Sequence, residues 1–509
     1  MVFTDTKKTT THDELRGGSE GTQPQIWSPE KLEEETRSCV VSLDQLASLE
    51  CASAGDSGHD GRASVRFKDA LVHASEHPKF LEAISAIDRS IADLHIATPW
   101  GISSETVPHP GLLGDNVPQF DFQRFYINLV SEMAVNLSGA AYCFVLCKDK
   151  KFYSSFARGN AFGPSDSKDS KFRLTIDQPV NIASVSKVLT AAAVLKALEQ
   201  KGDLDKALDD KIWQYFPQRW KDFKINVDFA EVSFRNCLQY MIGPIDQNGG
   251  QSTNIETINS WFESGQYIGY HLNKDTFGDP NYQTYNNISI AWFRIALFYF
   301  AAEDWVVKYL EGLAHIFATQ LLLKFPEDEW LNYFVSQWYI RYVRKAILNP
   351  IGVQLADMCH VSEFDSRPLE TKKATQTRYY PYPLEKASNG EEGLDWTSTG
   401  GGGGWVISAR DLARFWAHLR GGLILSGSAT DRFFNVVAPD ESFAVFPDVT
   451  NGHGLGFWKR GQATEFNGGY CSQLWDLPGG VQLTFVSNCN INPSTNTTAI
   501  LKAYKEAWK

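Results

Sequence analysis

Ser184 and Lys187 are the two residues of this sequence whose types and spacing best suit acyl-transfer chemistry. They stand three residues apart, so one helical turn would bring the hydroxyl and the ammonium onto the same face, whereas Ser186 would point about 100° away. Residues 188–195 are nearly all apolar, which predicts a helix buried on most sides. A lysine at the start of such a helix is partly desolvated, which favours the neutral amine and lets it take a proton from the serine.

The same two residues also fit an ordinary helix start. In this alternative Ser184 is the N-cap, and Lys187 extends its aliphatic stem along the surface with the ammonium in water. In the catalytic interpretation, the unpaired N–H groups of the helix N-terminus supply positive potential where an oxyanion would form. A serine and a lysine at this spacing do not separate the two interpretations, because both residue types are common.

The order of other segments along the chain favours the catalytic interpretation. These segments are the strand-like pair at 140–159, Ile182-Ala-Ser-Val-Ser-Lys187, Tyr285-Asn-Asn287, Ile347-Leu-Asn-Pro-Ile-Gly352, the glycine run and capped helix at 397–415, and Gly452-His-Gly-Leu-Gly-Phe-Trp458. In this order they resemble the serine β-lactamase-like family, which includes class C β-lactamases, DD-peptidases, esterases and acyl-transferring enzymes. The resemblance runs from about residue 120 to the C-terminus. It implies that Ser184 is the nucleophile and that Lys187, Tyr285 and Asn287 are the other catalytic residues.

The chemistry of Tyr285 and Asn287 is compatible with that assignment. A tyrosine close to Lys187 would feel an ammonium that favours the phenolate, so it could act as general base toward Ser184 and as acid toward the leaving group. Asn287 could hold the Lys187 side chain or a substrate carbonyl by hydrogen bonds. The alternative is a polar turn with one buried aromatic ring.

The third motif of the family is altered here. Phe466-Asn467-Gly468-Gly469 stands where the family has Lys or His, one residue, then Gly, and the cation is missing whether Phe466 or Asn467 takes the basic position. In β-lactamases and DD-peptidases that residue assists recognition of a substrate carboxylate, so we do not expect penicillin-like substrates. Instead, we expect Asn467, Gly468 and Gly469 to bind a neutral ester, thioester or amide, with a backbone N–H just after the glycine as the second oxyanion donor. The segment Leu238-Gln-Tyr-Met-Ile-Gly-Pro244 keeps the glycine of the family's His-Thr-Ser-Gly but loses its His and Ser.

Apolar runs at both ends of this region predict strands. Residues 140–146 and 151–156 flank a polar turn, and residues 472–477 and 481–487 flank Pro478-Gly-Gly480, which predicts two β-hairpins. The last residues, 497–508, have helical composition. The predicted fold class is α+β: an antiparallel β-sheet flanked by helices and closed by both ends of the chain, with an inserted all-helical subdomain, as in β-lactamases and transpeptidases.

We expect three regions along the chain. Residues 1–65 are rich in polar, charged and glycine residues and predict a disordered tail and linker, and residues 66–118 predict an N-terminal helical extension. Residues 119–509 form the β-lactamase-like domain. Within it, 305–337 is an aromatic-rich insertion, which we interpret as a helical hairpin packed on the core, or alternatively as a lid or membrane-surface contact.

Composition excludes several functional classes. The 509 residues carry 60 acidic against 48 basic side chains, a net charge of −12 without an extended Lys/Arg run, so we expect no nucleic-acid partner. The eight cysteines are scattered without zinc-like pairs, and the histidines form no His-x-His or His-Glu-x-x-His pattern, so we expect no metal and no cofactor. The polar start of the chain lacks the apolar region of a secretory signal, which favours a cytoplasmic location. Charges at Arg294, Glu303 and Asp304 interrupt the longest apolar stretch, so we expect no transmembrane span.

These patterns predict a serine-dependent acyl hydrolase or acyltransferase that works on a small-molecule substrate through an acyl-enzyme on Ser184. The sequence contains no Gly-x-Ser-x-Gly elbow, which counts against an α/β-hydrolase. Whether water, an alcohol or an amine accepts the acyl group stays open, as do the substrate and the oligomeric state. The alternative is a catalytically silent relative that serves as a binding or scaffold protein, because the basic residue of the third motif is absent.

Overall fold

The structure is a computed structural model that describes residues 74, 77–94, 120–161, 173–218, 229–242, 275, 288–321, 327–353, 377–382, 390, 401–434, 446–447, 457–465, 468–477 and 479–508. The chain divides into two units, Met1–Lys68 and Asp69–Lys509, and every described residue belongs to the second. The expected tail at 1–65 lies outside the described residues, and so do Tyr285, Asn287, Phe466 and Asn467.

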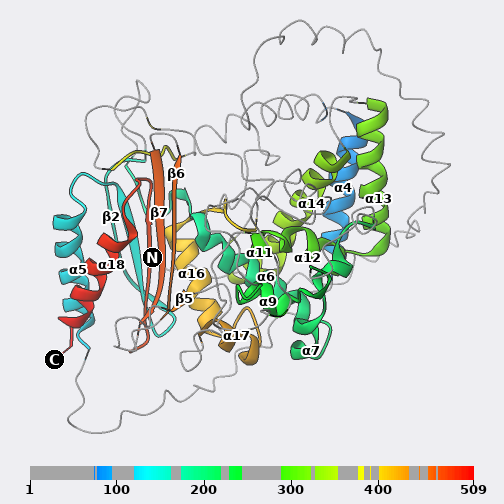
Figure 1. Ribbon diagram of the computed structural model, residues 1–509. Helices are drawn as coiled ribbons and strands as arrows, with labels where there is room; N and C mark the ends of the chain where they lie inside the picture. The colour runs from blue at the N-terminus through cyan, green and yellow to red at the C-terminus, as the bar shows by residue number, and fades with distance from the viewer. Residues whose placement is uncertain are drawn as a thin grey trace, which may run out of the picture. The chain divides into compact units, whose positions relative to one another are not determined.

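Within the described residues, a six-stranded antiparallel sheet has the order β2-β1-β8-β7-β6-β5 (Figure 1). Its strands are β1 (Tyr142–Lys148), β2 (Lys151–Arg158), β5 (Phe446–Pro447), β6 (Phe457–Glu465), β7 (Gly468–Leu477) and β8 (Val481–Ser487). The first and last hairpins join where β1 pairs with β8, with Tyr142 opposite Ser487 and Lys148 opposite Val481. The sheet is therefore closed by both ends of the domain. Together with the flanking helices, this confirms the predicted α+β fold class.

The two hairpin turns have the conformation that favours tight turns between twisted strands. Asp149 and Lys150, the two residues between the paired ends of β1 and β2, have φ of 48° and 67°. Gly479 and Gly480, which precede β8, have φ of 78° and 72°, so all four residues are left-handed. The turns also touch, because the Asp149 N–H donates to the Gly480 carbonyl at 2.9 Å. The φ of Gly480 favours glycine there, and a Cβ would also lie 2.3 Å from an oxygen of the Asp149 side chain, which would have to move.

Helices cover both faces of the sheet, which explains why every residue of β8 is buried (Figure 1). On one face, α5 (Phe122–Asn136) packs against α18 (Pro493–Lys505), which also contacts β6 and β7. On the other face, α16 (Ala409–Arg420) contacts β1 and β8, and its N-cap Ser408 accepts from the Asp411 N–H. The central strands thus lie between two helical layers.

A helical region follows on the α16 side of the sheet (Figure 1). Its helices are α6 (Ser186–Glu199), α7 (Leu204–Asp209), α9 (Phe234–Leu238), α11 (Ile288–Ala291), α12 (Phe293–Ala301), α13 (Asp304–Ile316) and α14 (Glu327–Val343). α6 contacts α11, α12 and α14, so this one helix connects the nucleophile segment to the helical region. None of the described helices is long and apolar enough to cross a lipid bilayer.

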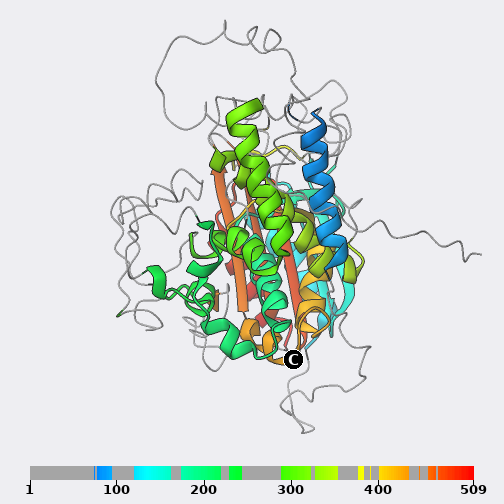
Figure 2. The same ribbon diagram turned by 90° about the vertical axis from the view of Figure 1, so that its right-hand side faces the viewer.

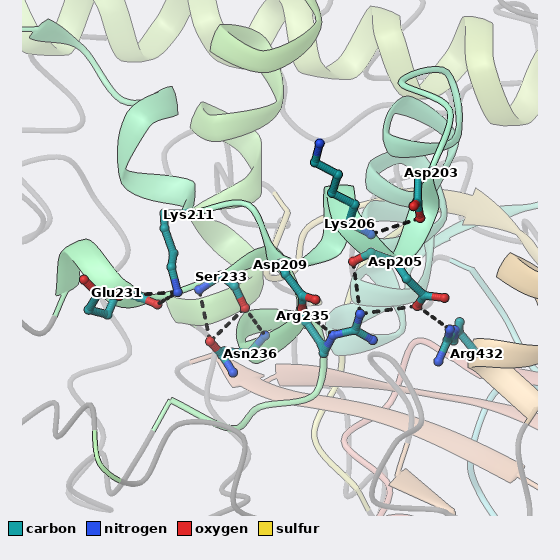
Figure 3. A network of polar contacts seen from close by, with 10 residues as sticks. All are labelled: Asp203, Asp205, Lys206, Asp209, Lys211, Glu231, Ser233, Arg235, Asn236 and Arg432. Atoms are coloured by element: carbon teal, nitrogen blue, oxygen red, sulfur yellow. Dashed lines mark hydrogen bonds and ion pairs between the residues drawn. The ribbon is translucent and has the colours of Figure 1, made fainter.

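Ion pairs join α7, α9 and α17 (Gly427–Phe434) (Figure 3). Arg235 of α9 contacts Asp209 at 2.7 Å and Asp205 at 3.3 Å, and Arg432 of α17 contacts Asp205 at 2.6 Å. Both aspartates are largely exposed, so each pair contributes little to stability. The pairs do show which sides of the three helices meet. α9 leads into the altered segment 238–244, which is described as far as residue 242.

In the described part of the predicted N-terminal extension, helix α4 (Pro78–Asp93) contacts α13 and α14 (Figure 2). Phe80 of α4 lies against the rings of Phe317, Tyr333 and Phe334. The segment 305–337 lies largely in α13 and α14, and the aromatic side chains that make it distinctive are mainly buried, with Trp330 and Phe334 fully inaccessible. The buried rings therefore form a core with α4, while Trp305 is 43% exposed.

Candidate active site

Ser184 and Lys187 lie in hydrogen-bond contact. The Lys187 Nζ is 3.0 Å from the Ser184 Oγ, so the pairing expected from their spacing is present. The local structure differs from the expectation in one respect: Ser184 lies in a 3₁₀ turn, η2 (Ala183–Val185), and α6 begins only at Ser186. The tighter turn still brings Ser184 and Lys187 together, because residues three apart eclipse in 3₁₀ geometry.

Lys187 is fully buried, and burial lowers the pKa of its ammonium to about 7. Its Nζ also donates a hydrogen bond to the carbonyl oxygen of Gly402. At neutral pH the neutral amine and the ammonium are therefore comparably populated. An amine in that state, within 3.0 Å of a hydroxyl, can act as the general base that a serine nucleophile needs.

The backbone immediately before Ser184 is strained. Ala183 has φ of 46°, a left-handed conformation that is uncommon for a residue with a side chain. It is held by the Asn181 side chain, whose Oδ1 accepts from the Ala183 N–H at 2.8 Å, while the Asn181 N–H donates to the Tyr379 hydroxyl. Strain of this kind persists where surrounding contacts fix it, and it is common at active sites. Here it turns the chain from strand β3 (Pro179–Asn181) into the nucleophile turn.

Ser186 has a structural contact instead. Its Oγ is fully buried and accepts a hydrogen bond from the Trp405 N–H at 3.0 Å. Ser184 is only partly buried. Of the two serines next to Lys187, Ser184 is thus the one that a substrate can reach.

The glycine turn at 401–405 lies against the start of α6. Gly401 has φ of 101°, and a Cβ there would lie 3.4 Å from the Ile290 carbonyl oxygen of α11, so the turn approaches that helix closely. α11 begins at Ile288, the residue after Asn287, and it also contacts α6. α11, which follows the Tyr285-Asn-Asn287 motif directly in sequence, therefore lies beside the glycine turn whose Gly402 carbonyl accepts from Lys187.

β7 lies on the other side of the nucleophile turn. The Ser472 Oγ donates to the Ile182 carbonyl at 2.6 Å, and η2 contacts both β6 and β7. Gly468 and Gly469 begin β7, opposite Glu465 and Thr464 of β6. Because side chains alternate along a strand, positions 468 and 470 share the face on which Ser472 meets η2.

Sequence reasoning did not identify the second layer of polar groups behind Lys187. Thr190 of α6 donates to the Gly401 carbonyl at 2.7 Å, and its Oγ1 lies 2.7 Å from the Tyr339 hydroxyl. Trp405 Nε1 donates to that hydroxyl at 3.1 Å. One signal was visible: Thr190 is the lone hydroxyl residue in the apolar run after Lys187. Among the described residues, no group of three or more His, Cys, Asp or Glu side chains is placed to bind a metal ion.

No protein-family model matches the sequence, and neither does any curated protein. The D-amino acid amidase of Ochrobactrum anthropi SV3 is similar in structure, with TM-score 0.47 and 16% identity over 75% of this chain and 99% of that chain. The octameric penicillin-binding protein homologue of Pyrococcus abyssi has TM-score 0.48 and 16% identity over 75% of this chain and 77% of that chain. A class C β-lactamase from Rhodobacter sphaeroides has TM-score 0.46 and 13% identity over 75% of this chain and 99% of that chain.

Proposed function

We propose that the protein is a serine-dependent acyl hydrolase or acyltransferase that forms an acyl-enzyme on Ser184. The observation that carries the proposal is the 3.0 Å contact between the Ser184 Oγ and the Nζ of Lys187, a fully buried lysine whose pKa is lowered to about 7. A serine alone is a weak nucleophile at neutral pH, and an adjacent neutral amine is one way to activate it.

In the proposed first half-reaction, Lys187 takes the Ser184 proton as the Oγ bonds to the substrate's carbonyl carbon. The carbonyl oxygen then carries the negative charge, and the positive end of α6 and the N–H of Gly469 stabilise it. Collapse of this intermediate breaks the bond to the leaving group, which receives the proton. In the second half-reaction, water, an alcohol or an amine attacks the acyl group, and the proton that it loses returns to Ser184.

Tyr285 and Asn287 complete the proposed catalytic set. We assign Tyr285 to proton exchange with Lys187 and the leaving group, and Asn287 to holding the lysine or the substrate carbonyl. Their support in the described chain is the position of α11, which starts one residue after Asn287 and contacts both α6 and the glycine turn.

The proposed substrate is a neutral ester, thioester or amide bound along Asn467, Gly468 and Gly469. The third motif carries no cation, and a carboxylate desolvated there without one would lose a charge-assisted contact. Short-chain nitrophenyl esters and nitrocefin, assayed on one preparation, test this assignment. We expect the esters to have the higher kcat/KM, and a preference for nitrocefin would overturn the substrate class without affecting the nucleophile.

Labelling with a fluorophosphonate, followed by intact-mass measurement, tests the nucleophile. We expect one adduct on the native protein and on Ser186→Ala, and none on Ser184→Ala. An adduct on Ser186 would overturn the assignment. A folded native protein that takes no label would favour the catalytically silent binding or scaffold protein.

We place this activity in the cytoplasm. The five described cysteines, Cys143, Cys147, Cys237, Cys471 and Cys489, are free thiols and all are buried. Such thiols are compatible with a reducing compartment.

A further inference from the structure

Tyr339 is a fully buried tyrosine of α14 whose hydroxyl lies behind the catalytic pair. It is 2.7 Å from the Thr190 Oγ1 and accepts from the Trp405 Nε1 at 3.1 Å. The three residues Tyr339, Thr190 and Trp405 come from three different parts of the chain: helix α14, helix α6 and the turn at 401–405. An effect of these three residues on catalysis would act through Gly402, whose carbonyl accepts from Lys187.

The direction of each hydrogen bond follows from what the groups can donate. An indole N–H only donates and a backbone carbonyl only accepts. The Thr190 Oγ1 lies 2.7 Å from the Gly401 carbonyl oxygen and 3.2 Å from the Ser186 carbonyl oxygen, and both can only accept. Its one proton therefore goes to a carbonyl, of which Gly401 is the nearer, and its oxygen accepts from Tyr339. The chain therefore runs in one direction, from the Trp405 Nε1–H through the Tyr339 and Thr190 hydroxyls to the Gly401 carbonyl.

Both ends of this chain lie on the same turn. Gly401 accepts at one end, Trp405 donates at the other, and Gly402, whose carbonyl accepts from Lys187, lies between them. The Trp405 N–H and carbonyl are also held, by the Ser186 Oγ and by the Ile182 N–H. Tyr339 thus closes a ring of hydrogen bonds across the turn that carries the carbonyl partner of Lys187.

We propose that Tyr339 is a positioning residue, which holds the turn 401–405 so that the Gly402 carbonyl keeps the Lys187 amine against the Ser184 hydroxyl. This inference rests on the proposed function, because it concerns the same catalytic pair. Through the Tyr339 hydroxyl, helix α14 would then help to position the catalytic pair.

The hydroxyl of Tyr339 keeps its proton under assay conditions. Burial raises its pKa to about 12, and this outweighs its hydrogen bonds with Thr190 and Trp405 and the charge of Arg294 on α12, which all lower the pKa. The ring of hydrogen bonds therefore stays intact across the pH range in which Lys187 titrates.

Tyr339→Phe removes the hydroxyl and keeps the ring, and Tyr342→Phe is the matched control. Tyr342 is also fully buried, one helical turn further along α14, but its hydroxyl has no hydrogen-bond partner among the described residues. We expect Tyr339→Phe to lower kcat for a nitrophenyl ester by about 10–100-fold at unchanged KM, the scale of a small misplacement of a reacting group. Tyr342→Phe should remain within about twofold of the native rate.

Thr190 supplies a second pair of variants in case Tyr339→Phe folds poorly. Thr190→Val breaks the same ring at nearly the same volume and should lower kcat similarly, while Thr190→Ser, which keeps a hydroxyl, should restore most of the loss. Equal losses in Thr190→Val and Thr190→Ser would overturn the proposal, because they would trace the effect to packing.

The titration of Lys187, followed by NMR of ¹³C-labelled lysine side chains, tests the inference without relying on turnover. In Tyr339→Phe we expect the loosened turn to admit water, so the Lys187 pKa should rise toward its ordinary value by at least half a unit. An unchanged Lys187 titration, together with unchanged kcat, would overturn the positioning role. Failure of the native protein to label at Ser184 would instead overturn the proposed function and leave the titration result standing.

Discussion

At the scale of single residues, Lys187 combines a cost in stability with its proposed use in catalysis. The folded state holds the ammonium in a fully buried place, and burial lowers its pKa to about 7 from an unfolded value near 10.4. The same desolvation that makes the amine available as a base makes the ammonium unfavourable in the fold. Activity and stability should therefore depend on pH through one group.

The first prediction concerns the pH dependence of turnover. If Lys187 acts as the base in its neutral form, kcat/KM for a nitrophenyl ester should rise with pH and reach half its plateau near pH 7. Lys187→Arg, which stays charged at every assay pH, should lose about 10²–10⁴ in rate and show no rise. A native profile that is flat between pH 5 and pH 9 would contradict the role of Lys187 as base.

The second prediction concerns unfolding free energy. Between about pH 7 and pH 10.4 the unfolded state binds more protons at Lys187 than the folded state does, so native stability should rise with pH across this window. Lys187→Met removes that dependence. It should be more stable than the native protein at pH 7, and its advantage should shrink by at most about 5 kcal/mol as pH approaches 10. Urea unfolding of both proteins at several pH values makes the measurement, and an advantage that grows with pH would contradict the prediction.

At the scale of elements, the catalytic pair depends on contacts between segments that are remote in sequence. The nucleophile turn is held by β3, by β7 through Ser472, and by the glycine turn through Trp405. β3 in turn pairs with β4 (Val406–Ser408), the strand that follows the glycine turn. A backbone change in the glycine turn should therefore reach Lys187 without any change to the catalytic residues.

The third prediction tests this dependence with Gly401→Ala. Because L side chains rarely adopt a φ of 101°, the alanine should destabilise the fold by about 1–3 kcal/mol and lower turnover. Gly427→Ala is the control, because Gly427 begins α17 and nothing lies within 4 Å of its would-be Cβ. The control should be neutral or stabilising by up to about 1 kcal/mol. Thermal unfolding and ester turnover are the measurements, and native-like behaviour of Gly401→Ala would show that the turn can adapt.

At the scale of the whole described unit, α4 belongs to the core of the helical region. The Lys345 Nζ donates to the carbonyl oxygens of Ile91, Ala92 and Leu94 at the C-terminal end of α4. The helix dipole stabilises a cation at that end. Trp338 donates to the Ser90 Oγ, and Arg341 pairs with Asp88 at 2.6 Å. α4 is therefore attached to the α14 region by packing, hydrogen bonds and charge.

The fourth prediction separates the two faces of α4. The Phe80 side chain is only 6% exposed and packs against other aromatic rings, so Phe80→Ala should lower the unfolding free energy by about 3–5 kcal/mol. The adjacent Leu81 is 57% exposed, and Leu81→Ala should stay within about 0.5 kcal/mol of the native protein. Denaturant unfolding of the two variants measures the difference, and equal effects would show that α4 does not pack as described.

The parts that the sequence could predict have local signals. The two hairpins carry turn residues between apolar runs, and the buried α6 follows directly from an apolar stretch after Lys187. The contact between Ser184 and Lys187 could be predicted because the two residues stand three apart in sequence, close to one helical turn. The 3₁₀ turn at Ser184 was not, since it depends on Ala183 being held in a left-handed conformation by the Asn181 side chain.

Contacts over long sequence separations could not be predicted in the same way. Tyr339 meets Thr190 across 149 residues and Lys187 meets Gly402 across 215, and neither residue type signals its partner. The aromatic-rich segment shows the limit most clearly. The composition of 305–337 is compatible with a buried core, with a lid and with a membrane contact. In the structure, Phe80 of α4 packs against rings such as Phe334, which is buried, and composition does not predict this contact.

The pairing of β1 with β8 has a consequence for synthesis on the ribosome. The Ala141 N–H contacts the Cys489 Sγ, and these residues are 348 positions apart in the chain. At about 5–20 residues per second, the β1–β2 hairpin waits roughly 20–70 s before its partner strand is made. During that time β1, six of whose seven residues are buried in the folded sheet, exposes an apolar edge that other nascent chains could pair with. The edge of β1 that later pairs with β8 therefore stays unpaired during synthesis until the last strand of the sheet is made.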